Sequence, residues 1–133
     1  MADVVKAVRI AATIEQVWAA LTDASTIAAW MDDDSAAVDL KVGGAYALFG
    51  RETTGAFTRV EPPALLEYTW RQSTWPRAWK DSLVRWELSA QDGATRVKLT
   101  HSAFPNDDER DSHDGGWDVY WLEPMIDYLE RGA

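Results

Sequence analysis

The sequence contains no cysteine, which excludes disulfide bonds, thiolate metal ligands and a cysteine nucleophile, and which favours an intracellular setting. It has only two histidines and no HExxH pair, and its acidic runs lack the spacing of a calcium-binding loop, so we expect no metal and no cofactor. The motifs of serine hydrolases and of nucleotide-binding loops are also missing. The sequence therefore carries no signature of the common enzyme classes.

Long apolar runs and an excess of positive charge are absent too. Lys6 and Arg9 interrupt the first ten residues, so we expect neither a signal peptide nor a membrane-spanning segment. The formal net charge is −9, from 13 basic and 22 acidic residues, and it repels nucleic-acid phosphates and anionic membranes. We expect a cytoplasmic protein with no nucleic-acid partner and no membrane insertion. A chain of 133 residues has room for one domain, residues 1–133.

The first half of the chain is predicted to form a strand, two short helices and a hairpin. β-Branched residues with partial alternation predict a strand near Val4 to Ile10. Thr13 and Gln16 have the spacing of a capping box and begin the first helix, and the second runs through "STIAAWM". Alternation in "AVDLKV" and the glycine pair that ends it predict a hairpin with "AYALF".

Four further strands are predicted in the middle of the chain. Two of them, 57–60 and 66–70, flank Pro62-Pro63, which we expect to prevent continuous pairing between them. The other two form a long hairpin turned at Asp92-Gly93. Alternation predicts its inward-facing residues, which are Val84, Trp86, Leu88, Val97, Leu99 and His101.

The C-terminal segment is predicted to be a polar loop, residues 105–116, followed by a helix that is apolar around much of its circumference. One stripe of this helix carries Trp117, Tyr120, Trp121, Pro124 and Tyr128. Pro124 either kinks the helix or begins a separate one in whose first turn it is tolerated. A helix this apolar must be embraced by the sheet, which describes an α+β domain.

Several strings occur in the same order over essentially the whole chain: "IEQVWAALTD", "VGGAYAL", "VEPPALLEYTWR", "TRVKLTHSAF" and "HDGGWDVYWLEPMIDYLE". Together they resemble the START-like (SRPBCC) superfamily, in its branch homologous to the activator of the heat-shock-protein-90 ATPase. The resemblance implies a helix-grip fold, in which a curved antiparallel sheet of six or seven strands wraps around a long C-terminal helix, with two short helices after strand one. It also implies a hydrophobic cavity that binds lipids, sterols, polyketides or other apolar molecules, and in which some members catalyse reactions.

Tryptophan is abundant, with eight residues, and three of them lie in "TWRQSTWPRAWK". Trp75 and Trp79 fall in a loop, where core packing alone does not explain them, so we expect them to cover the mouth of the cavity. The alternative is that Arg71, Arg77 and Lys80 stack on these rings and stiffen the loop.

A few inward polar groups on an apolar wall are typical of a small-molecule site. His101 is either a general base or ligand anchor, or a core histidine satisfied by a hydrogen bond. His113 is expected to be a solvated turn residue. The inward polar groups are Tyr46, Tyr68, Gln72, Ser82 and His101. The candidate ligand-binding residues are Tyr46, Tyr68, Trp70, Trp75, Trp79, Trp86, Leu99, His101, Trp117 and Trp121, and none is assigned a catalytic role.

The sequence thus favours binding of a small hydrophobic or aromatic ligand in an internal cavity between the sheet and the C-terminal helix. One alternative is a cavity enzyme of the cyclase or hydrolase type with His101 as base. Another is a co-chaperone-like interaction module that uses a surface patch and a chaperone partner.

Overall fold

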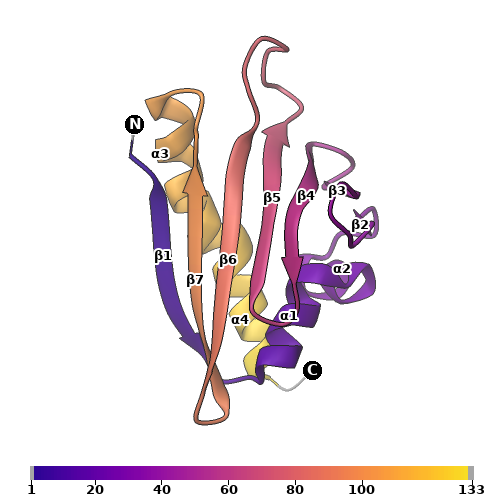
Figure 1. Cartoon of the computed structure of the whole chain (residues 1–133), viewed down its shortest axis with the longest axis vertical. Helices are drawn as coiled ribbons and strands as arrows, with labels where there is room; N and C mark the ends of the chain where they lie inside the picture. The colour runs from indigo at the N-terminus through magenta and orange to yellow at the C-terminus, as the bar shows by residue number, and fades with distance from the viewer. Residues whose placement is uncertain (1, 132–133) are drawn as a thin grey trace.

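Seven strands form one antiparallel sheet in the order β1-β7-β6-β5-β4-β3-β2, and the helices lie on one face of it (Figure 1). The structure, a computed structural model, describes residues 2–131. No helix in this range combines the length and the apolar character needed to cross a membrane. The strands are β1 (Val4–Ile10), β2 (Ala37–Val38), β3 (Ala45–Leu48), β4 (Thr53–Glu61), β5 (Leu65–Gln72), β6 (Ser82–Gln91) and β7 (Ala94–Ser102).

The two helices after β1 begin where the capping pattern predicted. In front of α1 (Ile14–Thr22), the Thr13 hydroxyl accepts from the Gln16 backbone N–H at 3.1 Å, and the Gln16 side chain accepts from the Thr13 N–H at 2.8 Å. Asp23 then ends α1 and caps α2 (Ala24–Met31). These reciprocal bonds satisfy N–H groups that a helix start leaves free, and they confirm the predicted capping box.

The hairpin after α2 is shorter than the alternation predicted. Only Ala37–Val38 pair with β3, and the predicted continuation of the strand through Leu40 and Val42 is wrong, since both side chains are exposed in a turn. The turn brings Gly44 so close to Asp39 that a Cβ on the glycine would lie 2.0 Å from the Asp39 carbonyl oxygen. This close approach, which only glycine allows, ends the strand.

The two prolines do not separate β4 from β5. The strands pair as a hairpin as far as Glu61 and Leu65, and Pro62-Pro63 occupy the turn between them. A turn does not require the backbone N–H that proline lacks, so the expectation of interrupted pairing is wrong.

The long hairpin of β6 and β7 has the predicted register. Trp86 lies opposite Leu99, and Val84 lies opposite His101. All four side chains are fully buried, whereas Glu87 on the other face of the sheet is exposed. The prediction of the inward set is therefore confirmed, and this set forms the floor on which the C-terminal helix packs.

The predicted polar loop at 105–116 is wrong, because most of it forms a helix. The Asn106 side chain caps α3 (Asp107–Gly116) by accepting from the Glu109 N–H at 2.8 Å. Three acidic residues in the first turn are favourable at the positive end of the helix dipole. The helix was not predicted because its sequence is highly polar and none of its residues is fully buried.

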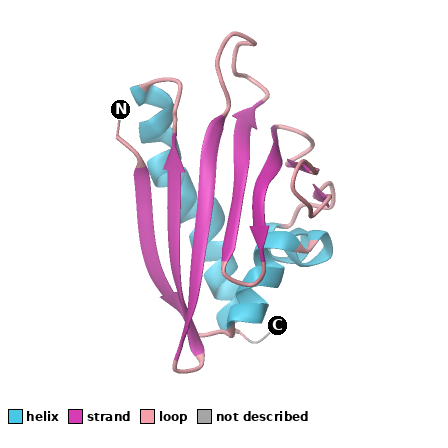
Figure 2. Cartoon of the chain, in the orientation of Figure 1, coloured by secondary structure: helices cyan, strands magenta, loops and turns pink. Residues whose placement is uncertain are grey.

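The chain continues from α3 through a π-helical turn, η1 (Trp117–Leu122), into α4 (Glu123–Glu130), as one helical rod (Figure 2). Pro124 lies in the first turn of α4, where proline is tolerated, as the second of the two alternatives predicted. However, α4 is not a separate helix, because no break lies between it and the preceding turn. In η1 the Glu123 N–H bonds five residues back to Asp118, and this wider turn carries the chain into proline without a broken helix.

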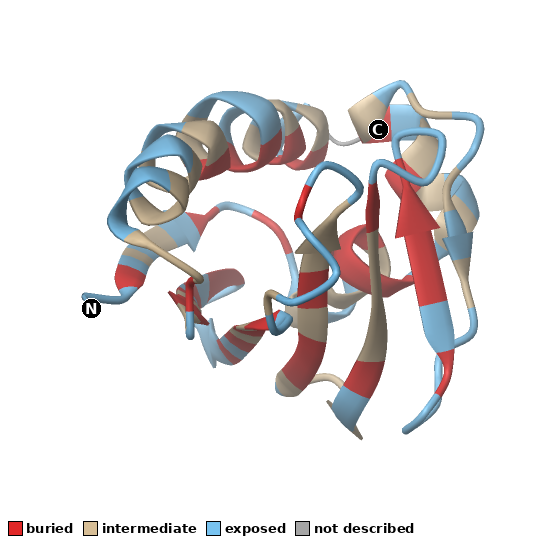
Figure 3. Cartoon of the chain, turned by 90° about the horizontal axis from the view of Figure 1, so that it is seen from above, coloured by how far each residue is buried: buried red, intermediate tan, exposed pale blue. Residues whose placement is uncertain are grey.

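The buried face of this rod runs through residues four apart, and it faces the sheet (Figure 3). Tyr120, which the predicted stripe placed inward, is 71% exposed. Tyr120 immediately precedes Trp121 in the chain, and neighbouring residues of a helix point in different directions, so its side chain lies off the buried face. The buried residues are Trp117, Trp121, Leu122, Met125 and Leu129.

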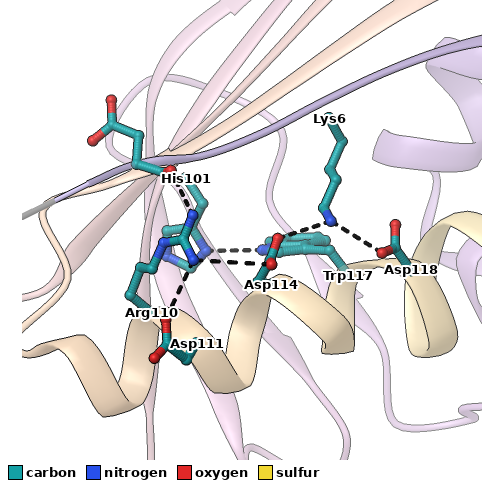
Figure 4. Close-up of polar contacts among 8 residues, drawn as sticks. Lys6, His101, Arg110, Asp111, Asp114, Trp117 and Asp118 are labelled. Carbon is teal, nitrogen blue, oxygen red and sulfur yellow. Dashed lines mark hydrogen bonds and ion pairs between the residues drawn. The ribbon is translucent and has the colours of Figure 1, made fainter.

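An ion-pair cluster ties the edge strand β1 to the helix (Figure 4). Lys6 Nζ lies 2.8 Å from Asp114 Oδ1 and 3.0 Å from Asp118 Oδ2. The hydrogen bond to Asp114 raises the pKa of Lys6, and the same bond lowers the pKa of Asp114. The cluster is half exposed, so its stabilisation is modest.

We expect Lys6→Met to lower the free energy of unfolding by about 0.2–1 kcal/mol at about pH 7. Because the pKa of Asp114 is lowered in the folded state, this stabilisation is present above the usual aspartate pKa of 3.8 and is lost as the pH falls below it. Urea melts of both proteins at neutral and acidic pH measure the difference. A loss of equal size at both pH values would contradict the ion-pair explanation.

Candidate ligand-binding site

A pocket of about 710 Å³ lies between the C-terminal helix, the end of α2, the turn between β3 and β4, and the end of β5. Figure 3 shows this end of the molecule from above, with the helix lying across the sheet. Apolar and aromatic side chains make up most of the lining: Trp30, Met31, Phe49, Trp70, Trp117, Val119, Tyr120, Trp121 and Pro124. The lining side chains with polar groups are Glu52, Thr53, Gln72, Thr74, Glu109, Ser112 and His113.

Four indoles form the wall of the pocket. The ring centroid of Trp117 lies 4.9 Å from those of both Trp70 and Trp121, and Trp121 lies 5.4 Å from Trp30. Trp86, which is fully buried, packs beneath them at 5.7 Å from Trp117 and does not line the pocket. Large rings therefore occupy the interior between sheet and helix, and the pocket lies above this layer.

Of the ten predicted ligand-binding residues, three line the pocket, namely Trp70, Trp117 and Trp121. Tyr46, Tyr68 and Leu99 lie with Trp86 in the core. The Tyr46 hydroxyl donates to the Thr69 carbonyl at 2.6 Å, and Tyr68 accepts from Trp86 Nε1 at 2.9 Å. Burial raises the pKa of both phenols, so both keep their protons and act as internal hydrogen-bond partners.

His101 is the centre of a buried hydrogen-bond chain (Figure 4 shows its contact with Trp117). Trp117 Nε1 can only donate, so His101 Nδ1 accepts from it at 2.9 Å. The other ring nitrogen, Nε2, then carries the hydrogen and donates to Ser82 Oγ at 2.7 Å, and Ser82 donates to the Trp70 carbonyl at 2.9 Å.

This environment keeps His101 neutral. Burial, with a smaller effect of nearby His113, lowers the pKa of His101 to about 2. Because one ring nitrogen already accepts a hydrogen bond and the other donates one, no lone pair is available to take a substrate proton. The geometry thus agrees with the core-histidine alternative and opposes a general base at this position.

The expectation that His113 is a solvated turn residue is wrong. It lies on α3, is half-buried, and lines the pocket. Its Nδ1 donates to the Glu109 carbonyl at 2.7 Å, and its Nε2 accepts from Trp70 Nε1 at 3.1 Å. In the amide orientation that satisfies both of its atoms, Gln72 accepts from the same indole at 3.0 Å. The spacing of four residues between Glu109 and His113 was the available signal, but it has meaning only on a helix.

The loop indoles lie behind the polar end of the pocket. Trp75 is only 5% exposed, and its Nε1 donates to Glu109 Oε1 at 2.6 Å. Its ring lies 6.2 Å from that of Trp79 and 6.1 Å from that of His113. Trp75 therefore supports α3 and is not among the residues that line the pocket.

Arg71 stiffens this loop through hydrogen bonds. Its guanidinium donates to the carbonyl oxygens of Pro76 and Trp79 and forms an ion pair with Asp81 at 3.1 Å. The loop is thus closed on itself by a charged side chain, which accounts for the arginine without stacking on the indoles.

Several pocket residues were missed by sequence reasoning, above all Phe49, Val119 and Tyr120. They are exposed by 36%, 57% and 71%, and they surround the opening. Phe49 has a φ of 54°, and its N–H donates to Asp33 Oδ2 at 2.7 Å. The sequence placed Val119 and Tyr120 in the predicted C-terminal helix, next to the candidate residues Trp117 and Trp121. It gave no such indication for Phe49, whose position depends on the conformation of the turn between β3 and β4. Within residues 2–131, no three histidine, aspartate or glutamate side chains gather to hold a metal ion.

The low pKa of His101 predicts a pH dependence of stability. The unfolded state takes up a proton below the usual pKa of 6.5, whereas the folded state does so only near 2, so stability falls as the pH drops through this window. Between about pH 6.5 and pH 5 the loss amounts to about 2 kcal/mol. His101→Gln should remove most of this slope in urea melts, and His113→Gln should not. Equal slopes in wild type and His101→Gln would contradict a neutral buried imidazole.

The chain is similar to proteins of known family and fold. Residues 11–130 match the family model described as "Activator of Hsp90 ATPase homolog 1-like protein". No curated protein matches the chain. An HSP90 activator from Plasmodium falciparum is 28% identical, with a TM-score of 0.86 over 96% of this chain and 95% of that one.

Two further structures have the same fold. CalU16 from Micromonospora echinospora is 26% identical, with a TM-score of 0.78 over 96% of this chain and 75% of that one. The Aha1 dimer from Colwellia psychrerythraea is 21% identical, with a TM-score of 0.84 over 99% of this chain and 98% of that one, and at this identity the likeness concerns the fold alone. The α+β helix-grip fold and the START-like superfamily are thereby confirmed. The chain belongs to the family of activator of Hsp90 ATPase homolog 1-like proteins.

Proposed function

We propose that this protein binds a small apolar or aromatic molecule in the pocket beside the C-terminal helix. The observation that carries the proposal is the composition of the pocket, which has a volume of about 710 Å³ and a lining with four indoles and few acidic or basic side chains. This volume lies within the range of about 300–1,000 Å³ found for small-molecule sites, and an apolar wall with a few polar groups is their usual lining.

The distribution of exposed apolar side chains supports the same proposal. Six large hydrophobic residues of the described chain are exposed, and three of them, Phe49, Val119 and Tyr120, line the opening of the pocket. Exposed apolar surface is unfavourable in water unless a ligand or a partner covers it, and here these three side chains lie together at the opening of the pocket. In this proposal Trp70, Trp117 and Trp121 contact the ligand, and Trp75 and Trp79 hold the polar end of the pocket in place behind Glu109.

A second candidate is interaction with a chaperone. The observation in its favour is the similarity, over nearly the whole chain, to a protein named as an HSP90 activator. Val119 and Tyr120, both exposed on η1, would then contribute to the contact. A pull-down with purified heat-shock protein 90 separates the two candidates, because small-molecule binding alone predicts no complex.

Small-molecule binding can be tested at the rim of the pocket. Phe49→Ala and Tyr120→Ala should each weaken binding of an uncharged naphthalene probe by about 1 kcal/mol, which is the value of one ring contact. Both side chains are exposed, so the free energy of unfolding should change by less than about 0.5 kcal/mol. Equilibrium dialysis gives the affinity and a urea melt gives the stability.

Val42→Ala is the matched control, because Val42 is 66% exposed and lies away from the pocket. Its affinity for the probe should equal that of the wild type. An equal affinity in all four proteins would overturn the proposed site. Native mass spectrometry of protein purified from cells would then identify a retained molecule directly by its mass.

A further inference from the structure

The charges around the pocket have one sign. Among the described residues that line it, the acidic and basic side chains are Glu52, Glu109 and His113, and no lysine or arginine is present. Neither carboxylate takes part in an ion pair with a basic residue of residues 2–131. Neither carboxylate of the lining therefore has a basic ion-pair partner among these residues.

His113 is held at the polar end of the pocket by protein partners. Its Nε2 accepts from Trp70 Nε1, which can only donate, and its Nδ1 donates to the Glu109 carbonyl. Both ring nitrogens are thus occupied by hydrogen bonds within the protein.

The two glutamates line the same pocket as the aromatic side chains. Glu109 accepts from Trp75 and lies one helical turn before His113, whose ring centroid is 5.9 Å from that of Trp70. Glu52 lines the pocket from the turn between β3 and β4, where its backbone carbonyl accepts from the Ser73 N–H at 2.7 Å. Carboxylates in a pocket lined mainly by apolar and aromatic side chains favour cations, because opposite charges attract each other more strongly where water is partly excluded.

We propose that the ligand of this pocket is an apolar or aromatic molecule that carries a cationic nitrogen, a protonated amine or a quaternary ammonium, placed between Glu52, Glu109 and the indole wall. The inference rests on the proposed binding function and defines the chemical class of the ligand. An anionic ligand would meet two carboxylates and no basic residue of the described lining, so fatty acids and other carboxylates are disfavoured.

Three naphthalene probes of similar size test the inference by equilibrium dialysis: 2-naphthyl-trimethylammonium, its uncharged isostere 2-tert-butylnaphthalene, and 2-naphthoate. We expect the cation to bind about tenfold more tightly than the uncharged isostere, and the anion to bind more weakly than both. Added salt should weaken binding of the cation and leave the uncharged probe unaffected.

Glu109→Gln is the decisive variant, because a glutamine oxygen can still accept from Trp75 while the charge is removed. It should reduce affinity for the cation about three- to tenfold and leave the uncharged probe unchanged. Asp108→Asn, an exposed change on the same helix outside the pocket lining, alters the net charge equally and should have no effect.

The outcomes separate the inference from the function on which it rests. If the uncharged probe binds as tightly as the cation, or if the anion binds best, the ligand class is wrong and the apolar pocket remains. If Asp108→Asn reduces affinity for the cation as much as Glu109→Gln does, the preference arises from net charge and the site is wrong. If no probe binds, the proposed function fails, and the inference fails with it.

Discussion

The packing of Trp117 on the sheet is the contact on which the rest of this structure depends. Its ring lies between those of Trp70, Trp86 and Trp121, and its N–H is held by His101 on β7. One residue is thus fixed both by ring packing and by a directed hydrogen bond, which sets the rotation and the height of the helix above the sheet. The π-helical turn begins at this residue, so the register of α4 follows from it as well.

The same contact explains why the pocket lies at one end of the molecule. Indoles and phenols fill the interior between sheet and helix, and the hydrogen-bonding groups of Tyr68 and His101 are satisfied there by protein partners. The pocket lies beyond this layer, and Val119, one of the apolar residues that line it, is largely exposed. Because the core is filled, the pocket lies beside it and not within it.

The polar end of the pocket has a different origin. Trp70 and Trp75 each use their indole N–H on a group of α3, the former on His113 and the latter on Glu109. These bonds hold a helix with a highly polar sequence against the sheet, although it buries no residue of its own. They also place a carboxylate and an imidazole beside aromatic rings, and the chemical selectivity of the pocket depends on that placement.

The sequence by itself determined the elements whose side chains repeat with a regular period. Alternation settled the register of Trp86 and Leu99, and the pair of Thr13 and Gln16 settled the start of α1, because each pattern acts over a few neighbouring residues. Only the tertiary structure decided the state of His101 and the helical conformation around His113, since both depend on indoles distant in the chain. Hydrogen bonds between residues so far apart leave no period in a sequence, and for that reason only the tertiary structure defines the pocket.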